Sequence, residues 1–135
     1  MGFQIRYDAR QRVVRTVFFG SVFLVDKMAA ARQVAERYGH MQSLRIIVDV
    51  READILLSVA ERQQFGSYAA ALKGLNHARV GVLHAPDYNA NVVINSVARA
   101  EGMDVAEFIS EGALLLWLYG GSASALSDTS HACGN

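Results

Sequence analysis

The sequence is poor in several residue types that would place it in a particular class of protein. Its 135 residues include one cysteine, Cys133, one proline and two lysines, Lys27 and Lys73. A single thiol excludes an internal disulfide, which is typical of a reducing compartment. No apolar run approaches the ~20 residues of a membrane-spanning helix. These absences, together with an N-terminal segment that lacks a signal-peptide pattern, predict a cytoplasmic protein without membrane insertion.

Charge of either sign is also scarce. Thirteen basic residues balance thirteen acidic ones, so the formal net charge is zero, and no basic block occurs. A neutral chain of this kind is a poor partner for nucleic acid, whose binding depends on neutralising phosphates. No His, Cys and Asp spacing matches a metal site, and no glycine-rich loop stands between a strand and a helix. We therefore expect neither a metal nor a cofactor.

What the chain does have is a regular succession of strand and helix patterns. Alternating or β-branched runs predict strands, and amphipathic segments between them predict helices. The nearly continuous apolar run 44–50 predicts a central strand covered on both faces. The expected strands are 3–7, 13–19, 44–50, 78–84 and 103–109. The expected helices follow the N-caps Ser21, Ser58, Asp87 and Ser110.

This order predicts an α/β fold with a mixed five-stranded sheet and the element order β-β-α-β-α-β-α-β-α. The first two strands form a hairpin, and the later ones alternate with helices, which favours right-handed parallel crossovers. Residues 1–119 are expected to form a single domain. Residues 120–135 are rich in Gly, Ser and Ala and predict a flexible C-terminal tail.

In open α/β sheets, ligands bind beyond the carboxyl ends of the strands. The residues predicted at this edge, as a site for a partner or a ligand, are Ser21, Asp49, Arg51, Glu52, His84, Asp87 and Ser110. The alternative is that Ser21, Asp87 and Ser110 only cap helices. His84 and Asp87 could form an acid–base pair, but no nucleophile is spaced to join them. The sequence thus predicts no catalytic residue and no enzyme.

The last helical segment is apolar all round. Such a helix is either buried or exposes an apolar patch. One interpretation is that Trp117 packs on the sheet. The other is an apolar contact or pocket wall formed by Leu114, Leu115, Trp117 and Leu118.

Several stretches together resemble the SpoIIAA-like (STAS-like) family, whose superfamily includes CRAL-TRIO/SEC14-type lipid-binding domains. They are strand 46–50 after a helix that ends in Tyr38-Gly39, strand 79–83, and the ending 108–118 with Ser110-Glu111 and Trp117-Leu118. The resemblance implies a mixed sheet and a regulatory role in binding. Anti-sigma-factor antagonists of this family carry a phosphorylated serine in an Asp-Ser-Ser-Gly motif. This chain has Asp49-Val50-Arg51-Glu52 there, so no phosphoswitch is expected.

The sequence predicts a non-enzymatic regulatory or protein-interaction module. One of the interactions expected of it is homodimer formation. The alternative is a carrier or sensor of a small apolar, lipid-like ligand. Its pocket would lie between the sheet and the C-terminal helices, with walls formed by Phe65, Tyr68, Val93, Val97 and Trp117. A small enzyme built on His84 and Asp87 is the third hypothesis.

Overall fold

A computed structural model describes residues 2–89 and 91–120 and contains nine elements in the predicted order. The strands are β1 (Phe3–Asp8), β2 (Val13–Val22), β3 (Arg45–Ile55), β4 (Arg79–Leu83) and β5 (Asp104–Phe108). The helices are α1 (Leu24–Tyr38), α2 (Val59–Ala71), α3 (Val92–Ala100) and α4 (Glu111–Tyr119). The predicted fold class is therefore confirmed. The predicted tail lies, from residue 121 on, outside the described residues.

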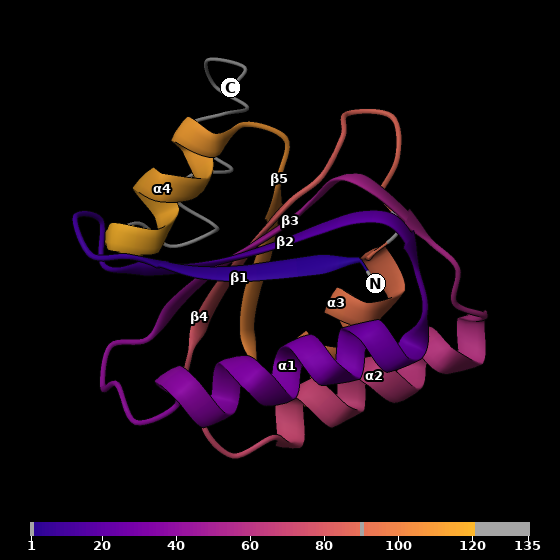
Figure 1. The fold of residues 1–135 in the computed structure, drawn as a ribbon, viewed down its shortest axis with the longest axis horizontal. Coiled ribbons are helices and arrows are strands. Elements are labelled where there is room, and N and C mark those ends of the chain that lie inside the picture. Colours follow the sequence, from indigo (N-terminus) through magenta and orange to yellow (C-terminus); the bar gives the residue numbers. More distant parts are fainter. Residues whose placement is uncertain (1, 90, 121–135) are drawn as a thin grey trace.

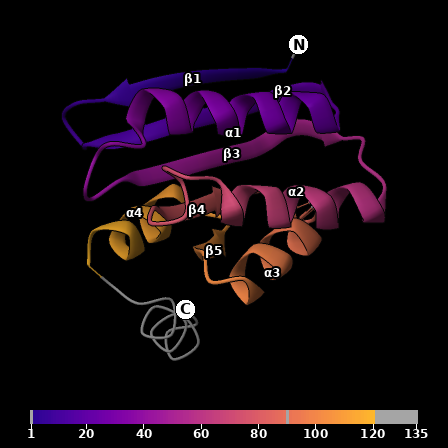
Figure 2. The same ribbon diagram turned by 90° about the horizontal axis from the view of Figure 1, so that it is seen from below.

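The five strands form one sheet in the order β1-β2-β3-β4-β5. β1 pairs antiparallel with β2, and the other neighbouring pairs are parallel. Because the parallel strands follow in sequence order and each crossover is right-handed, α1, α2 and α3 lie on the same face. Figures 1 and 2 show these three helices on one side of the sheet and α4 on the other.

The sheet therefore has a core on each face. The larger core joins the sheet to α1, α2 and α3. The smaller core joins Val13, Ile47, Leu83 and Ala106 to α4. At the end of α4, Arg45 and Arg79 donate to the carbonyl oxygens of Leu118 and Trp117, at 3.0 and 2.7 Å. These two arginines satisfy carbonyls that a helix C-terminus leaves free and complement its dipole.

Two strands are longer than the sequence predicted. β2 does not stop at Gly20, and the polar stretch 51–54 does not end β3, because the two strands pair with each other as far as Val22 and Ile55. Beyond Asp49 the neighbouring strand β4 has ended. The outer part of β3 can therefore alternate buried and exposed residues, and its polar side chains face solvent.

The predicted helix caps are right at two helices and wrong at two. Ser58 accepts from the Glu61 amide and Ser110 accepts from the Ala113 amide, as expected. Ser21 instead lies inside β2, and α1 begins after Phe23, whose amide donates to Asp26. Asp87 is exposed in a turn that ends before α3 begins at Val92. Local spacing identified a capping residue but could not show how far each preceding strand or turn extends.

Candidate binding cavity

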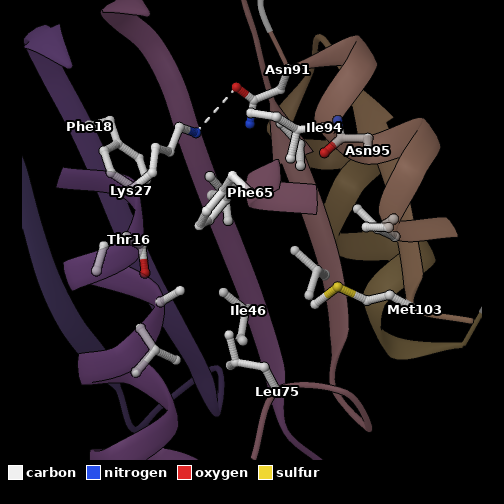
Figure 3. A pocket seen from close by; sticks show the side chains of 18 residues that line it. Thr16, Phe18, Lys27, Ile46, Phe65, Leu75, Asn91, Ile94, Asn95 and Met103 are labelled. Carbon is white, nitrogen blue, oxygen red and sulfur yellow. Dashed lines mark hydrogen bonds between the residues drawn. The ribbon is translucent and has the colours of Figure 1, made fainter. Parts of the chain in front are cut away.

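A cavity of about 80 Å³ lies inside the larger core, between the sheet and the helices α1, α2 and α3 (Figure 3). Strands β2 to β5 form its floor. Of its 18 lining residues, 14 are apolar. The four polar ones are Thr16, Lys27, Asn91 and Asn95, and all four are buried. The cavity therefore combines an apolar wall with a few buried polar groups.

Lys27 is the unusual member of this lining. Its side chain is 1% exposed, although lysine is almost never fully buried without a partner charge. The Nζ atom donates to Oδ1 of Asn91 at 3.2 Å and lies 4.4 Å from the centroid of the Phe18 ring. No ion pair among the described residues involves Lys27. The buried amine of Lys27 therefore contacts a neutral acceptor and an aromatic face, and no described residue serves as its counter-ion.

The electrostatic environment disfavours the charged form of this amine. Burial, and then the positive charge of Arg62 on α2, lower the pKa of Lys27 from its ordinary 10.5 to about 7. Arg62 is itself fixed near α1, with its guanidinium donating to the carbonyl oxygens of Ile55 and Leu57. Lys27 therefore changes charge near neutral pH.

The other polar side chains of the cavity come from different elements, Thr16 from β2 and Asn95 from α3. The Thr16 hydroxyl is buried and has no hydrogen-bond partner among the described residues. Asn95 donates through Nδ2 to Oε2 of Glu107 at 2.7 Å, so its amide group is fixed. Figure 3 shows Lys27 and Asn91 pointing toward each other at one end, with Thr16 on the strand side. Lys27 and Thr16 thus have donors that no described residue uses, and the amide nitrogen of Asn91, whose Oδ1 accepts from Lys27, has donors as well.

Sequence reasoning did not identify Lys27 as a site residue. The buried residues of α1 are Lys27, Ala30, Ala31 and Val34. These four positions follow the spacing i, i+3, i+4, i+7 of a buried helix stripe. This spacing indicates the buried face of the helix, but a lysine within such a stripe is exposed far more often than it is buried.

The expected ligand pocket differs from this cavity in its walls. Of the five residues predicted to line it, only Phe65 does so. Trp117 lies on the opposite face of the sheet, where Leu114, Trp117 and Leu118 are 0%, 1% and 1% exposed and pack on the strands. Leu115 is half-buried beside them. These residues of α4 fill a core and do not line the cavity around Lys27, although Leu118 also lines a surface pocket beside Arg45 and Arg79.

The residues predicted at the carboxyl edge do not converge on one point. Because β2 and β3 extend past β4, Ser21, Arg51 and Glu52 lie within strands. His84 hydrogen-bonds through Nδ1 to the carbonyl oxygen of Ala85 at 2.7 Å. No hydrogen bond among the described residues joins His84 to Asp87, so the structure does not form the hypothetical acid–base pair.

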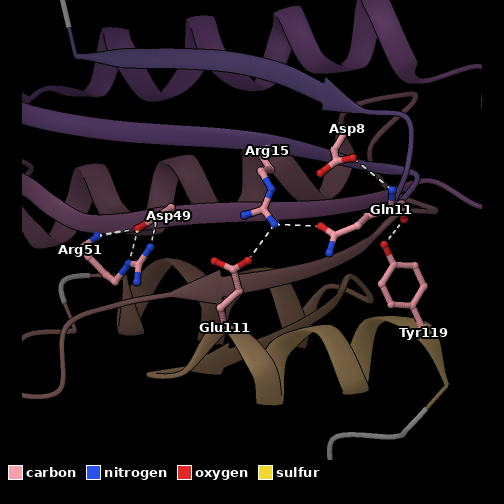
Figure 4. Close-up of polar contacts among 7 residues, drawn as sticks. All are labelled: Asp8, Gln11, Arg15, Asp49, Arg51, Glu111 and Tyr119. Carbon is pink, nitrogen blue, oxygen red and sulfur yellow. Dashed lines mark hydrogen bonds and ion pairs between the residues drawn. The ribbon is translucent and has the colours of Figure 1, made fainter.

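One pair from the predicted edge does come together. Arg51 donates through Nε and Nη2 to the two carboxylate oxygens of Asp49, at 3.0 and 2.8 Å (Figure 4). Beside it, Arg15 pairs with Glu111 at 2.8 Å, next to the predicted Ser110. Both ion pairs lie on the sheet face that carries α4, and the Asp49 pair raises the pKa of Arg51 further. In both pairs the arginine is matched by a carboxylate of the same chain.

Residues 2–89 and 91–120 contain neither a metal cluster nor a membrane-spanning helix. No group of three or more His, Cys, Asp or Glu side chains there could hold a metal ion. Within the same residues, no helix is both long and apolar enough to cross a membrane.

The architecture is an α/β sandwich that matches a SpoIIAA-like fold. One similar solved structure is an uncharacterized protein of the DUF3478 family with a SpoIIAA-like fold, from Shewanella loihica PV-4. The two chains are 15% identical with a TM-score of 0.55, and the alignment covers 86% of this chain and 91% of the other. This likeness gives no support to the expected link with CRAL-TRIO domains. No family model and no curated protein matches the chain.

Proposed function

We propose that this protein is a non-enzymatic binding module that carries or senses a small, mainly apolar ligand in the cavity around Lys27. The observation that supports the proposal is a buried amine without a counter-ion at the wall of an apolar cavity. A polar group buried for structure alone costs stability unless it is fully paired. A ligand that uses the group gives a reason for its presence.

The size and lining of the cavity fit such a ligand. A volume of about 80 Å³ is several times the roughly 10–15 Å³ that one buried water needs. Cavities lined by apolar side chains stay dry and accept apolar molecules. The SpoIIAA-like fold is compatible with a regulatory role, in which occupancy of the cavity changes the stability of the helices above it.

The proposal is tested by filling the cavity. Ala98 on α3 lines it and is 3% exposed. We expect wild type to bind straight-chain alcohols between butan-1-ol and octan-1-ol in calorimetric titrations. Ala98→Leu should weaken that binding at least about tenfold, because the new side chain occupies the same space. Native mass spectrometry of freshly purified protein should also show an added mass that is lost on denaturation.

The matched control is Ala100→Leu, the same substitution on the same helix at an exposed position. This variant should bind the alcohols as wild type does. If neither these alcohols nor the carboxylic acids of the same chain lengths bind to wild type, or if both variants bind equally well, the proposed function is wrong.

A second candidate function, self-association as an interaction module, is favoured by a separate observation. Large apolar side chains are exposed where β2 and β3 end and where α1 and α2 begin. They are Phe23, Val25, Leu56 and Val59, between 44% and 70% exposed. Exposed apolar patches mark interaction surfaces. We propose a second copy of this chain as the occupant, because a formal net charge of zero imposes little repulsion between copies.

The oligomeric state tests this second candidate. Size-exclusion chromatography with light scattering should show a dimer for wild type and a monomer for the double variant Val25→Lys/Val59→Lys. Leu116→Lys is the control, because Leu116 is 68% exposed on α4, across the sheet. It should remain a dimer. A monomeric wild type at the highest soluble concentration would argue against self-association.

A further inference from the structure

We infer that the ligand of this cavity is a small monocarboxylic acid with an apolar body, whose carboxylate pairs with Lys27. This inference rests on the proposed function and names the ligand class. It follows from three features of the site: the donors that face the cavity, the charges around Lys27, and the apolar character of the remaining wall.

The first feature is that Lys27 and Thr16 have hydrogen-bond donors that no described residue uses. An ammonium group has three N–H donors, and Asn91 accepts one from Lys27. The hydroxyl of Thr16 is buried in the same lining without a partner. The amide nitrogen of Asn95 donates a hydrogen bond to the carboxylate of Glu107. A carboxylate accepts hydrogen bonds through its oxygens and so complements the remaining donors of the Lys27 ammonium group, and a charge-assisted hydrogen bond is roughly twice as strong as a neutral one.

The second feature is that no residue in the described part of the chain places a negative charge against the amine. Lys27 is the one ionisable side chain in the lining. On α2 the nearby charge is Arg62, which is positive. On α1 the neighbouring carboxylate of Asp26 accepts from the Phe23 amide. Strands β2 and β3 contribute no ionisable group to the cavity, and on β5 the Glu107 carboxylate is held by Asn95. The missing counter-ion of Lys27 would thus come from the ligand.

The third feature is the rest of the wall. Away from Lys27, Thr16 and the two asparagines, every lining residue is apolar, from Phe65 at the helices to Met103 near β5. A second charged group on the ligand would be buried there without a partner, at a large desolvation cost. The geometry therefore favours one carboxylate and an uncharged body, and it disfavours dicarboxylic and amino acids.

Binding of this kind is coupled to a proton. A carboxylate binds the ammonium form of Lys27, and its charge raises the pKa of the amine above about 7 in the complex. Below about pH 7 the amine of the free protein is already charged, so affinity for the carboxylate is flat. Above it, binding must take up a proton, and affinity falls by up to about tenfold per pH unit. A neutral alcohol has no such dependence.

The experiment compares hexanoate with hexan-1-ol in calorimetric titrations of the full chain, from about pH 6 to about pH 8.5. We expect hexanoate to bind wild type at least about tenfold more tightly than hexan-1-ol at the acidic end. Its affinity should decline above pH 7, whereas that of hexan-1-ol should stay constant. Proton uptake in the alkaline range is read from titrations in buffers of different ionisation enthalpy.

The variant Lys27→Met keeps the shape of the side chain and removes the charge. It should bind hexan-1-ol as well as wild type does and lose the preference for hexanoate. Lys73→Met, at the exposed second lysine, should behave as wild type. If wild type binds hexan-1-ol but not hexanoate, or binds hexanoate with no pH dependence, the inference is overturned and the proposed function stands. If butanoate to octanoate and the matching alcohols all fail to bind, both are overturned.

Discussion

Lys27→Met is expected to stabilise the ligand-free protein by about 2–4 kcal/mol at pH 7. The reason is that wild type must either bury an ammonium group or release its proton on folding. Burial lowers the pKa of Lys27 to about 7, whereas the unfolded chain keeps the ordinary value of 10.5. Each unit of difference between the pKa values of Lys27 in the folded and unfolded states corresponds to about 1.4 kcal/mol of stability. The methionine side chain loses the bond to Asn91 but carries no such penalty.

The same pKa shift fixes the sign of the pH dependence. Between about pH 7 and 10.5 the unfolded chain binds one more proton than the folded protein at this site. Stability of wild type relative to Lys27→Met therefore rises with pH, by about 1.4 kcal/mol per unit, and the advantage of the variant shrinks. Below pH 7 both states are protonated and the difference is constant.

Urea unfolding of both proteins at about pH 7, 8 and 9 measures this difference directly. Lys73→Met serves as the control. Because Lys73 is exposed, its replacement should neither stabilise the protein nor change how the free energy of unfolding depends on pH. A difference between wild type and Lys27→Met that does not change with pH would mean that Lys27 is not buried as described.

Gly66→Ala is expected to destabilise the protein by about 2 kcal/mol, against the direction of helix propensity. Alanine is favoured over glycine inside a helix by about 1 kcal/mol. At Gly66, however, an added Cβ would lie 2.7 Å from the carbonyl oxygen of Ile94 and 2.9 Å from Cβ of Val97. These contacts are closer than real Cβ atoms tolerate, so α2 and α3 must separate, and overpacking of this kind commonly costs 1–3 kcal/mol or more.

Gly112→Ala on α4 provides the comparison. The nearest atom to an added Cβ there is Ser110 Oγ at 3.9 Å, so propensity acts without a clash. Urea unfolding should show Gly112→Ala unchanged or slightly more stable and Gly66→Ala less stable. An alanine at position 66 that stabilises the protein would contradict the close packing of α2 on α3.

Gly66 also shows where sequence reasoning fails. A glycine within a helical pattern lowers the expected continuity of the helix. The structure keeps α2 continuous and uses the missing Cβ to bring α3 close, with Phe65 one residue before it on the cavity wall. Whether a glycine weakens a helix or permits a contact depends on a segment about thirty residues away, which no local window contains.

The sequence by itself determined the order of strands and helices, the mixed sheet and two of the four caps. These follow from local periodicity and from the handedness of crossovers, which act within one strand–helix–strand unit. The spacing of Ser58 and Glu61 is an example, because both capping groups lie within one turn. The site hypothesis depended instead on where strands end, and it did not converge on one point.

Only the tertiary structure decided which face of α1 is buried, that α4 covers the opposite face of the sheet, and that a cavity exists. The cavity brings together Thr16 from β2, Lys27 from α1, Phe65 from α2 and Asn91 at the start of α3. Its volume is what remains after side chains from seven elements have packed, and the pKa of Lys27 depends on that burial. Such properties depend on how residues far apart in the sequence pack together, so no local pattern in the sequence specifies them.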